Sequence, residues 1–89
     1  MKQLYVTVPN KTGLHARPAR LFVKEASKFQ CEILIKKKQD QDFVNAKSIL
    51  TVMALGAGQN TDLVIVADGI DEDAAIACIK ELFRQNLME

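Results

Sequence analysis

The sequence is poor in the residues that build metal and redox centres. It has one histidine and two cysteines in 89 residues, and the cysteines, Cys31 and Cys78, stand far apart with no Cys-x-x-Cys pair. Such a set cannot supply the clustered ligands of a zinc site, so we expect no metal. In a chain without an export signal, we expect both cysteines to be reduced and to pack as small apolar side chains.

The sequence also lacks a surplus of either charge. Twelve Lys and Arg face eleven Asp and Glu, and the formal net charge of +1 at pH 7 favours neither nucleic acid nor an anionic membrane. The one basic run, residues 36–38, leads into amide and acidic residues at 39–42, a pattern typical of a solvated hairpin tip. We therefore expect no nucleic-acid partner.

Long apolar runs and nucleotide-binding loops are absent as well. No segment approaches the length of a membrane span, and residues 1–8 alternate polar and apolar side chains, unlike a signal peptide. There is no GxxxxGK[ST] loop, and residues 56–58 lack the third glycine of a dinucleotide-binding loop. We expect a cytoplasmic protein that does not insert into membranes, does not bind ATP by itself and takes no cofactor.

What the sequence does contain is a succession of strand patterns. The length fits one domain over residues 1–89. Apolar residues alternate with polar ones near 4–8 and 31–35, and Phe43-Val44 suggests the second strand of a hairpin. Residues 63–67 are apolar throughout, which predicts a fourth strand that is apolar on both faces.

Helical spacing alternates with these strands. Apolar residues at i, i+3, i+4 and i+7 predict a helix over about residues 16–28. Ser48 is placed as the N-cap of a short second helix, and Asp71 begins the acidic start of a last one. The order βαββαβα belongs to the α+β class and suggests a four-stranded antiparallel sheet, with three helices on one face and water on the other.

One short run, residues 12–19, carries the candidate chemistry. Gly13 permits a tight bend, Pro18 fits the first turn of a helix, and His15 falls where the chain enters that helix, with free backbone amides just beyond it. The positive end of a helix disfavours the imidazolium, so we expect a neutral ring whose nitrogen can attack phosphorus. Each residue alone also has a purely structural interpretation, and their joint spacing is the specific signal.

The residues after His15 suit the phosphate that would result. The backbone amides of Ala16 and Arg17 would lie at the helix N-terminus, and the guanidinium of Arg17 is a planar donor that matches phosphate oxygens. The alternative is that Arg17 is only a charge on the helix surface. On the first interpretation, one site both binds the phosphoryl group and reacts with it.

The central part of this run resembles the active-site motif of the HPr family, the histidine-containing phosphocarriers of bacterial sugar phosphotransferase systems. It reads Gly13-Leu14-His15-Ala16-Arg17-Pro18-Ala19. Residues 45–49, 52–53 and 55–56 are similar to the family's second signature, so the resemblance covers the whole chain. It implies an open-faced β-sandwich fold. It also implies that the protein is not an enzyme but is itself the phosphorylated intermediate. Enzyme I, charged by phosphoenolpyruvate, would phosphorylate His15 at its tele or pros nitrogen, and the group would pass to the cytoplasmic domain of a sugar permease.

The resemblance also implies a second modification. Ser48 would be phosphorylated by an ATP-dependent HPr serine kinase, which would add nearly two negative charges beside Ile49 and Met53 and weaken partner docking. The alternative is that Ser48 is only a helix N-cap, and the motif does not decide between the two.

Apolar residues of the second helix are candidate docking residues. Ile49, Leu50 and Met53 cannot all face inward from one short helix, so we expect some of them to be exposed near His15, with core packing as the alternative. Arg20, on the outer side of the first helix, is a further candidate, and it replaces a small residue that is common in relatives.

Two other functions fit parts of the pattern. A nitrogen-branch paralogue would use the same chemistry for regulation instead of transport, although the second helix favours the sugar branch. A corepressor-type module would act with a transcription factor after phosphorylation of Ser48, but relatives confined to that role lack the histidine. We expect a monomer whose partners are enzyme I and sugar-permease domains, with the serine kinase and the transcription factor added where Ser48 is modified.

Overall fold

The computed structural model describes residues 1–88 of the chain. Its elements are β1 (Lys2–Thr7), α1 (Ala16–Ala26), β2 (Glu32–Lys37), β3 (Val44–Asn45), α2 (Ile49–Ala54), β4 (Asp62–Asp68), α3 (Glu72–Arg84) and a 3-10 turn, η1 (Asn86–Met88). The predicted order βαββαβα is confirmed. The turn η1 was not predicted, and it buries Leu87 at 2% exposure against the core.

The strands form one four-stranded sheet in the order β1-β4-β2-β3. Every neighbouring pair is antiparallel, and Ile65 of β4 lies between Leu4 of β1 and Ile35 of β2. The predicted hairpin of β2 and β3 is confirmed, although β3 pairs at only two positions, Val44 and Asn45. The last strand in the chain is therefore inserted at the centre of the sheet.

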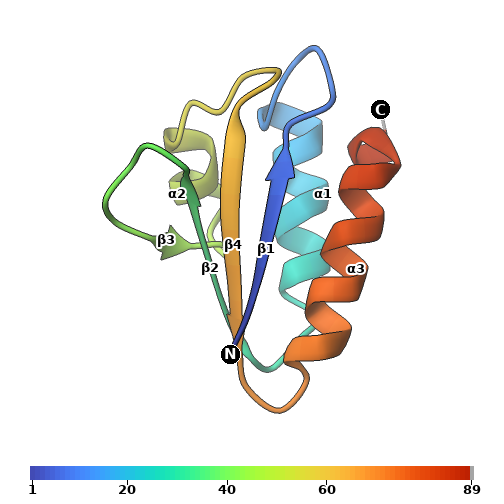
Figure 1. Ribbon diagram of the computed structural model, residues 1–89. Helices are drawn as coiled ribbons and strands as arrows, with labels where there is room; N and C mark the ends of the chain where they lie inside the picture. Colours follow the sequence, from blue (N-terminus) through green and yellow to red (C-terminus); the bar gives the residue numbers. More distant parts are fainter. Residues whose placement is uncertain (89) are drawn as a thin grey trace.

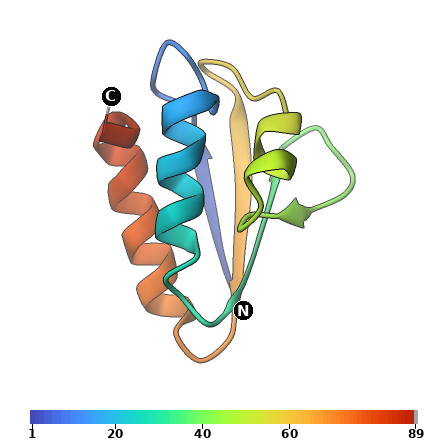
Figure 2. The ribbon, with the colours of Figure 1, turned by 180° about the vertical axis from the view of Figure 1, so that it is seen from behind.

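The three α-helices cover one face of this sheet, as the sequence predicts (Figures 1 and 2). Phe22 of α1 is fully buried there and meets Phe83 of α3 edge to face, with the ring centroids 6.0 Å apart. Such a contact adds to the hydrophobic burial that holds the two helices together. Helix α1 ends at Ala26, two residues before the predicted end, because Lys28 and Phe29 make i→i−3 turn bonds in place of helical ones.

The opposite face of the sheet has no α-helix of residues 1–88 over it, but the residues at the centre of that face are buried. Val64 and Val66 of β4 are each only 6% exposed. Tyr5 and Lys36 stand opposite Val64 on the two flanking strands, a position from which long side chains can shield an apolar neighbour. The prediction that β4 is apolar on both faces is thus confirmed.

The two cysteines differ from each other. Cys31 is 3% exposed, as expected for a packing residue, and burial raises the pKa of its thiol to about 11. Cys78 is only partly buried, and its Sγ lies 3.5 Å from Oε1 of Glu25 on α1. The expected packing role is confirmed for Cys31, whereas Cys78 is only partly packed and also contacts a carboxylate.

Candidate functional site

The loop between β1 and α1 is held against the segment that follows α2. Leu14 donates its backbone N–H to the carbonyl of Ala57 at 2.8 Å, and Gly13 donates its own to the carbonyl of Asn10 at 3.1 Å. Gly13 has φ +72°, and a Cβ at this position would lie 2.5 Å from the Ala57 oxygen and 2.8 Å from Cα of Gly58. The tight bend predicted for Gly13 is therefore confirmed, and the close approach of a second loop is an additional reason for glycine there.

His15 is the N-cap of α1, where the sequence predicts it. Its backbone is extended, with φ −140° and ψ 155°, its side chain is exposed, and the ring makes no hydrogen bond to the helix amides. Ala16 follows with φ +45°, a left-handed conformation that costs a non-glycine residue about 1 kcal/mol. The chain thus turns sharply just after the imidazole and leaves the ring open to solvent.

The first turn of α1 contains no acidic residue. Its leading N–H groups, which include those of Ala16 and Arg17, have no partner within a helix, and the helix dipole makes this end positive. Arg17 is exposed and forms no ion pair with any acidic group in residues 1–88. The start of α1 therefore offers donors and positive potential beside His15, and no acidic group of residues 1–88 forms an ion pair with Arg17 there.

A shallow hollow of about 170 Å³ adjoins the imidazole. It is lined by His15 together with Thr12, Leu14, Gly56, Ala57 and Gly58. The sequence analysis considered residues 56–58 as an incomplete dinucleotide-binding loop and did not predict that they form a wall of this site. Two glycines within three residues were the available signal, since small residues permit a close approach of another segment.

A basic strip continues along α1 from the same end. Arg17, Arg20 and Lys24 border a larger hollow of about 380 Å³, with Leu21 and Leu87 as its apolar lining. Arg20 is exposed, so the structure leaves it accessible to a partner. The 3-10 turn that supplies Leu87 was not predicted, and the apolar lining was missed with it.

Ser48 is the N-cap of α2 by position, as predicted, but its side chain makes no capping hydrogen bond. The hydroxyl of Thr51 donates instead to the carbonyl of Asn45 at 2.7 Å and contacts the carbonyl of Ser48 at 3.1 Å. The turn before α2 is thus fixed by Thr51 and the backbone. The N-cap position of Ser48 is thus confirmed, but its hydroxyl does not make the hydrogen bond usual for a serine cap.

The apolar residues of α2 divide between core and surface. Leu50 is 78% exposed, whereas Ile49 and Met53 are partly buried against the core and Val52 is fully buried. The expectation that these residues cannot all face inward is confirmed by Leu50. Whether any of them contacts a partner stays a prediction.

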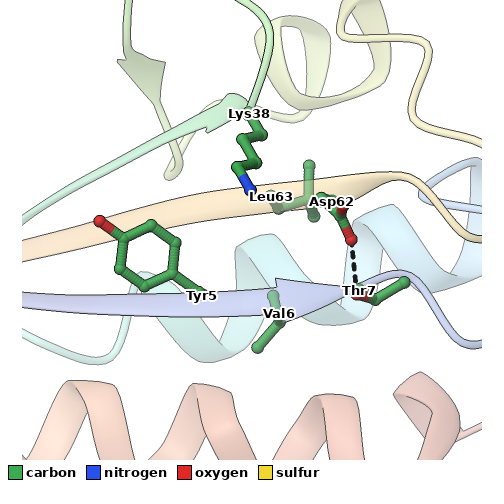
Figure 3. Close-up of a pocket in the computed structure, with 6 residues that line it drawn as sticks. All are labelled: Tyr5, Val6, Thr7, Lys38, Asp62 and Leu63. Carbon is green, nitrogen blue, oxygen red and sulfur yellow. Dashed lines mark hydrogen bonds between the residues drawn. The ribbon is translucent and has the colours of Figure 1, made fainter.

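A separate hollow of about 240 Å³ lies on the helix-free side of the sheet (Figure 3). Tyr5 of β1 and Lys38, just beyond β2, stand on either side of β4, and the hydroxyl of Thr7 donates to Oδ1 of Asp62 at 2.7 Å. Its lining contains no histidine, so it is a site distinct from that of His15.

Within residues 1–88, no group of three or more His, Cys, Asp or Glu gathers in a way that could hold a metal ion. None of the helices in this range has the length and apolar character needed to cross a bilayer.

Comparison with known proteins identifies the family. A family model described as "PTS HPr component phosphorylation site" matches residues 2–85. Phosphocarrier protein HPr of Treponema pallidum is 45% identical over 84 residues, which are 94% of this chain and 93% of that protein. HPr-C-His of Thermoanaerobacter tengcongensis has a similar structure, with a TM-score of 0.93, 44% identity, and coverage of 100% of this chain and 98% of that one. An HPr dimer from the same organism matches with a TM-score of 0.78 and 45% identity over the whole of both chains. The exposed histidine at the start of α1 thus stands in a chain that belongs to the HPr family, the phosphocarrier proteins of the phosphotransferase system.

Proposed function

We propose that this phosphocarrier takes a phosphoryl group onto His15 from enzyme I charged by phosphoenolpyruvate and passes it to the cytoplasmic domain of a sugar permease. The observation that carries the proposal is an exposed imidazole at a helix start that has no acidic residue in its first turn. Arg17, exposed and without an ion pair in residues 1–88, stands two residues further on. The protein serves as the covalent intermediate and is not itself the catalyst.

In the transfer, the lone pair of a neutral ring nitrogen of His15 attacks phosphorus. A phosphorus–nitrogen bond forms as the bond from phosphorus to the donor breaks, and the donor's leaving atom keeps that electron pair. The second transfer is the same displacement, with the imidazole as the leaving group. The tele and pros nitrogens of an imidazole are both chemically competent.

The start of α1 would stabilise the phosphorylated form. Amides at a helix N-terminus bind phosphate oxygens, and here those of Ala16 and Arg17 are the nearest in sequence to the ring. The guanidinium of Arg17 adds a charge-assisted donor on a flexible side chain. These contacts are electrostatic, so they can hold the group without blocking the next transfer.

The direct test is the intact mass of the protein after incubation with phosphoenolpyruvate and enzyme I. The wild type should gain one phosphoryl group, and His15→Ala should gain none while its circular dichroism spectrum stays native. Gln39→Ala, an exposed change in the hairpin loop, is the matched control and should react like the wild type. The bond should be labile in acid and stable in base. A His15→Ala variant that still gained the group would contradict the proposal.

Regulation through Ser48 is a finer part of the proposal. The side chain is partly exposed and makes no capping bond, so the hydroxyl is not committed to the helix. Its phosphorylation by an ATP-dependent serine kinase would place negative charge two residues from the exposed Leu50 and weaken docking of the transfer partners. A kinase-dependent mass increase that disappears in Ser48→Ala would support this, whereas an equal increase in Ser48→Ala would contradict it.

The branch of the pathway is also a proposal. We favour sugar transport over the nitrogen branch because of the residues of the second helix. We favour it over a corepressor that acts with a transcription factor because the histidine is present and its ring is exposed. The test offers the phosphorylated protein equal amounts of a sugar-permease domain and a nitrogen-branch acceptor. Faster transfer to the permease domain is the expected result, and faster transfer to the other acceptor would reverse the assignment.

We further propose that the carrier acts as a monomer in the cytoplasm. Few large apolar side chains among the described residues are exposed: Met1, Tyr5, Leu50 and Ile70. The solved dimer of the Thermoanaerobacter tengcongensis protein makes the test worthwhile. Sedimentation should give the monomer mass, and a dimer at low concentration would refute this part.

A further inference from the structure

Asn10 is the one polar residue buried in the part of the chain that the structure describes. It is 4% exposed and lies in the loop between β1 and α1, five residues before His15. We propose that Asn10 is a positioning residue for phosphoryl transfer, which holds the loop so that His15 stands in its reactive orientation. This inference rests on the proposed function of His15.

The side-chain amide of Asn10 binds the loop from inside. Its Nδ2 donates to the carbonyl of Gly13 at 2.8 Å and to the hydroxyl oxygen of Thr12 at 3.1 Å. Its own carbonyl accepts the N–H of Gly13 at 3.1 Å. One residue therefore holds both of the residues that precede Leu14 and His15.

The contact with Gly13 fixes a particular peptide group. The Gly13 carbonyl and the Leu14 N–H belong to the same planar unit. Asn10 binds its oxygen at 2.8 Å, and Ala57 accepts from its nitrogen at 2.8 Å. Because both sides of this plane are held, rotation of the unit is restricted, and with it the backbone that leads directly into His15.

Core packing does not account for this residue. The other side-chain oxygen of Asn10, Oδ1, is buried with no hydrogen-bond partner. A buried acceptor without a partner costs free energy that an apolar residue of similar size would avoid. The amide cannot simply be turned over, since Oδ1 in place of Nδ2 would set one acceptor against the Gly13 carbonyl. The residue is thus suited to hold the loop at some expense of stability.

The test compares turnover of the variant proteins by enzyme I with phosphoenolpyruvate as the donor. Asn10→Asp keeps the shape of the side chain but removes the donor, and Asn10→Ala removes both. We expect each to lower kcat about tenfold or more, since a small misplacement of a reacting group lowers rates steeply. KM should stay within about twofold, because a side chain that is 4% exposed does not touch the partner.

A control variant and the split between kcat and KM separate positioning from stability. A merely destabilised protein has fewer folded molecules, which raises the apparent KM and leaves kcat at saturation unchanged. Gln59→Glu is the matched control, because Gln59 is an exposed side-chain amide on the facing loop that donates to the Pro9 carbonyl at 3.3 Å. It should leave both constants unchanged. A kcat equal to that of the wild type in both Asn10 variants would overturn the inference.

A measurement on the wild type covers the case in which neither variant folds. The side-chain NH₂ of Asn10 should exchange slowly with water, before and after phosphorylation of His15, in a ¹⁵N-resolved NMR spectrum. Fast exchange would overturn the inference. A wild type that accepts no phosphoryl group would instead overturn the proposed function, so the two failures can be told apart.

Discussion

Helices α1 and α3 start at opposite ends of the molecule, and the two starts are occupied differently (Figure 2). Before α3, the carboxylate of Asp71 accepts the backbone N–H groups of Gln30 and Cys31 at 2.8 and 2.9 Å. Glu72 and Asp73 follow in the first turn. At the start of α1 there is no acidic residue, and the exposed side chains of His15 and Arg17 stand there instead.

The difference shows how one physical property serves two purposes. Every helix start is positive, and negative charge near it is stabilising. At α3 the chain supplies the anions itself, and the result is a fixed junction between two loops. The first turn of α1 has no acidic residue. Its positive potential is therefore available to a phosphoryl group that binds there and is later transferred.

A glycine lies close to a neighbouring backbone at each of these two helix starts. Replacing either glycine should give the largest loss of stability. A Cβ on Gly13 would lie 2.5 Å from the Ala57 oxygen, and one on Gly69, at φ +153°, would lie 2.7 Å from Cα of Cys31. Gly13→Ala and Gly69→Ala should each lower the free energy of unfolding by about 3 kcal/mol, from backbone strain plus the clash. Urea unfolding measures both.

Only the substitution near the start of α1 should lower phosphorylation as well as stability. Gly13→Ala should also lower the kcat of phosphorylation, measured on folded protein, whereas Gly69→Ala should not. Gly56→Ala is the control for strain alone, since φ is +65° with nothing within 4 Å of the added Cβ, and about 1 kcal/mol is expected. An equal loss of unfolding free energy in Gly13→Ala, Gly69→Ala and Gly56→Ala would contradict the role of the close backbone contact.

A smaller effect should follow from removing the cation at the α1 start. Arg17→Gln should lower the rate of phosphorylation of His15 about tenfold, which corresponds to about 1.4 kcal/mol of transition-state stabilisation. Lys24→Gln, further along the same basic strip, should change it less than about threefold. Stopped-flow kinetics with enzyme I would compare them, and equal effects would mean that only general positive potential matters.

The smallest effect concerns the α3 end and depends on pH. Hydrogen bonds from the backbone N–H of Gln30, and then of Cys31, lower the pKa of Asp71. Its ionised form therefore stabilises the fold above about pH 4, near the ordinary pKa of an aspartate, and the contribution is lost as the pH falls through the lowered value. Asp71→Asn should be less stable than the wild type at pH 7 and no less stable near pH 3, by urea unfolding.

The same variant should not change phosphorylation of His15. Asp71 lies at the other end of the molecule, beside Gln30 and Cys31. Loss of transfer in Asp71→Asn, at a pH where the variant is folded, would mean that the two helix starts are not independent.

Local patterns in the sequence were sufficient for the elements and for His15. The period-two and period-3.6 spacings predicted the order of strands and helices, and the joint spacing of Gly13, His15 and Pro18 predicted the entry into α1. These features depend on residues close together in the chain. The elements and the entry into α1 can therefore be predicted from the spacing of residues along the chain.

Contacts between distant residues were not predictable in this way. The insertion of β4 between β1 and β2, the close approach of Gly13 and Ala57, and the hydrogen bond from the Gln30 N–H to the Asp71 carboxylate all join residues that are far apart in the chain. Ser48 is an instructive local failure, since the position of the cap was right but its hydroxyl makes no bond. A pattern shows which residue types are suitable, whereas the partner depends on the folded geometry.

The central claim is that the positive start of α1 binds the phosphoryl group, whereas carboxylates of the chain itself lie at the positive start of α3. The most direct measurement is a pair of ¹H–¹⁵N NMR spectra, recorded before and after His15 is phosphorylated by enzyme I and phosphoenolpyruvate. We predict that the amides of Ala16 and Arg17 show the largest downfield shifts, while those of Glu72 and Asp73 do not move. A fully phosphorylated His15 with unshifted Ala16 and Arg17 amides would contradict the account.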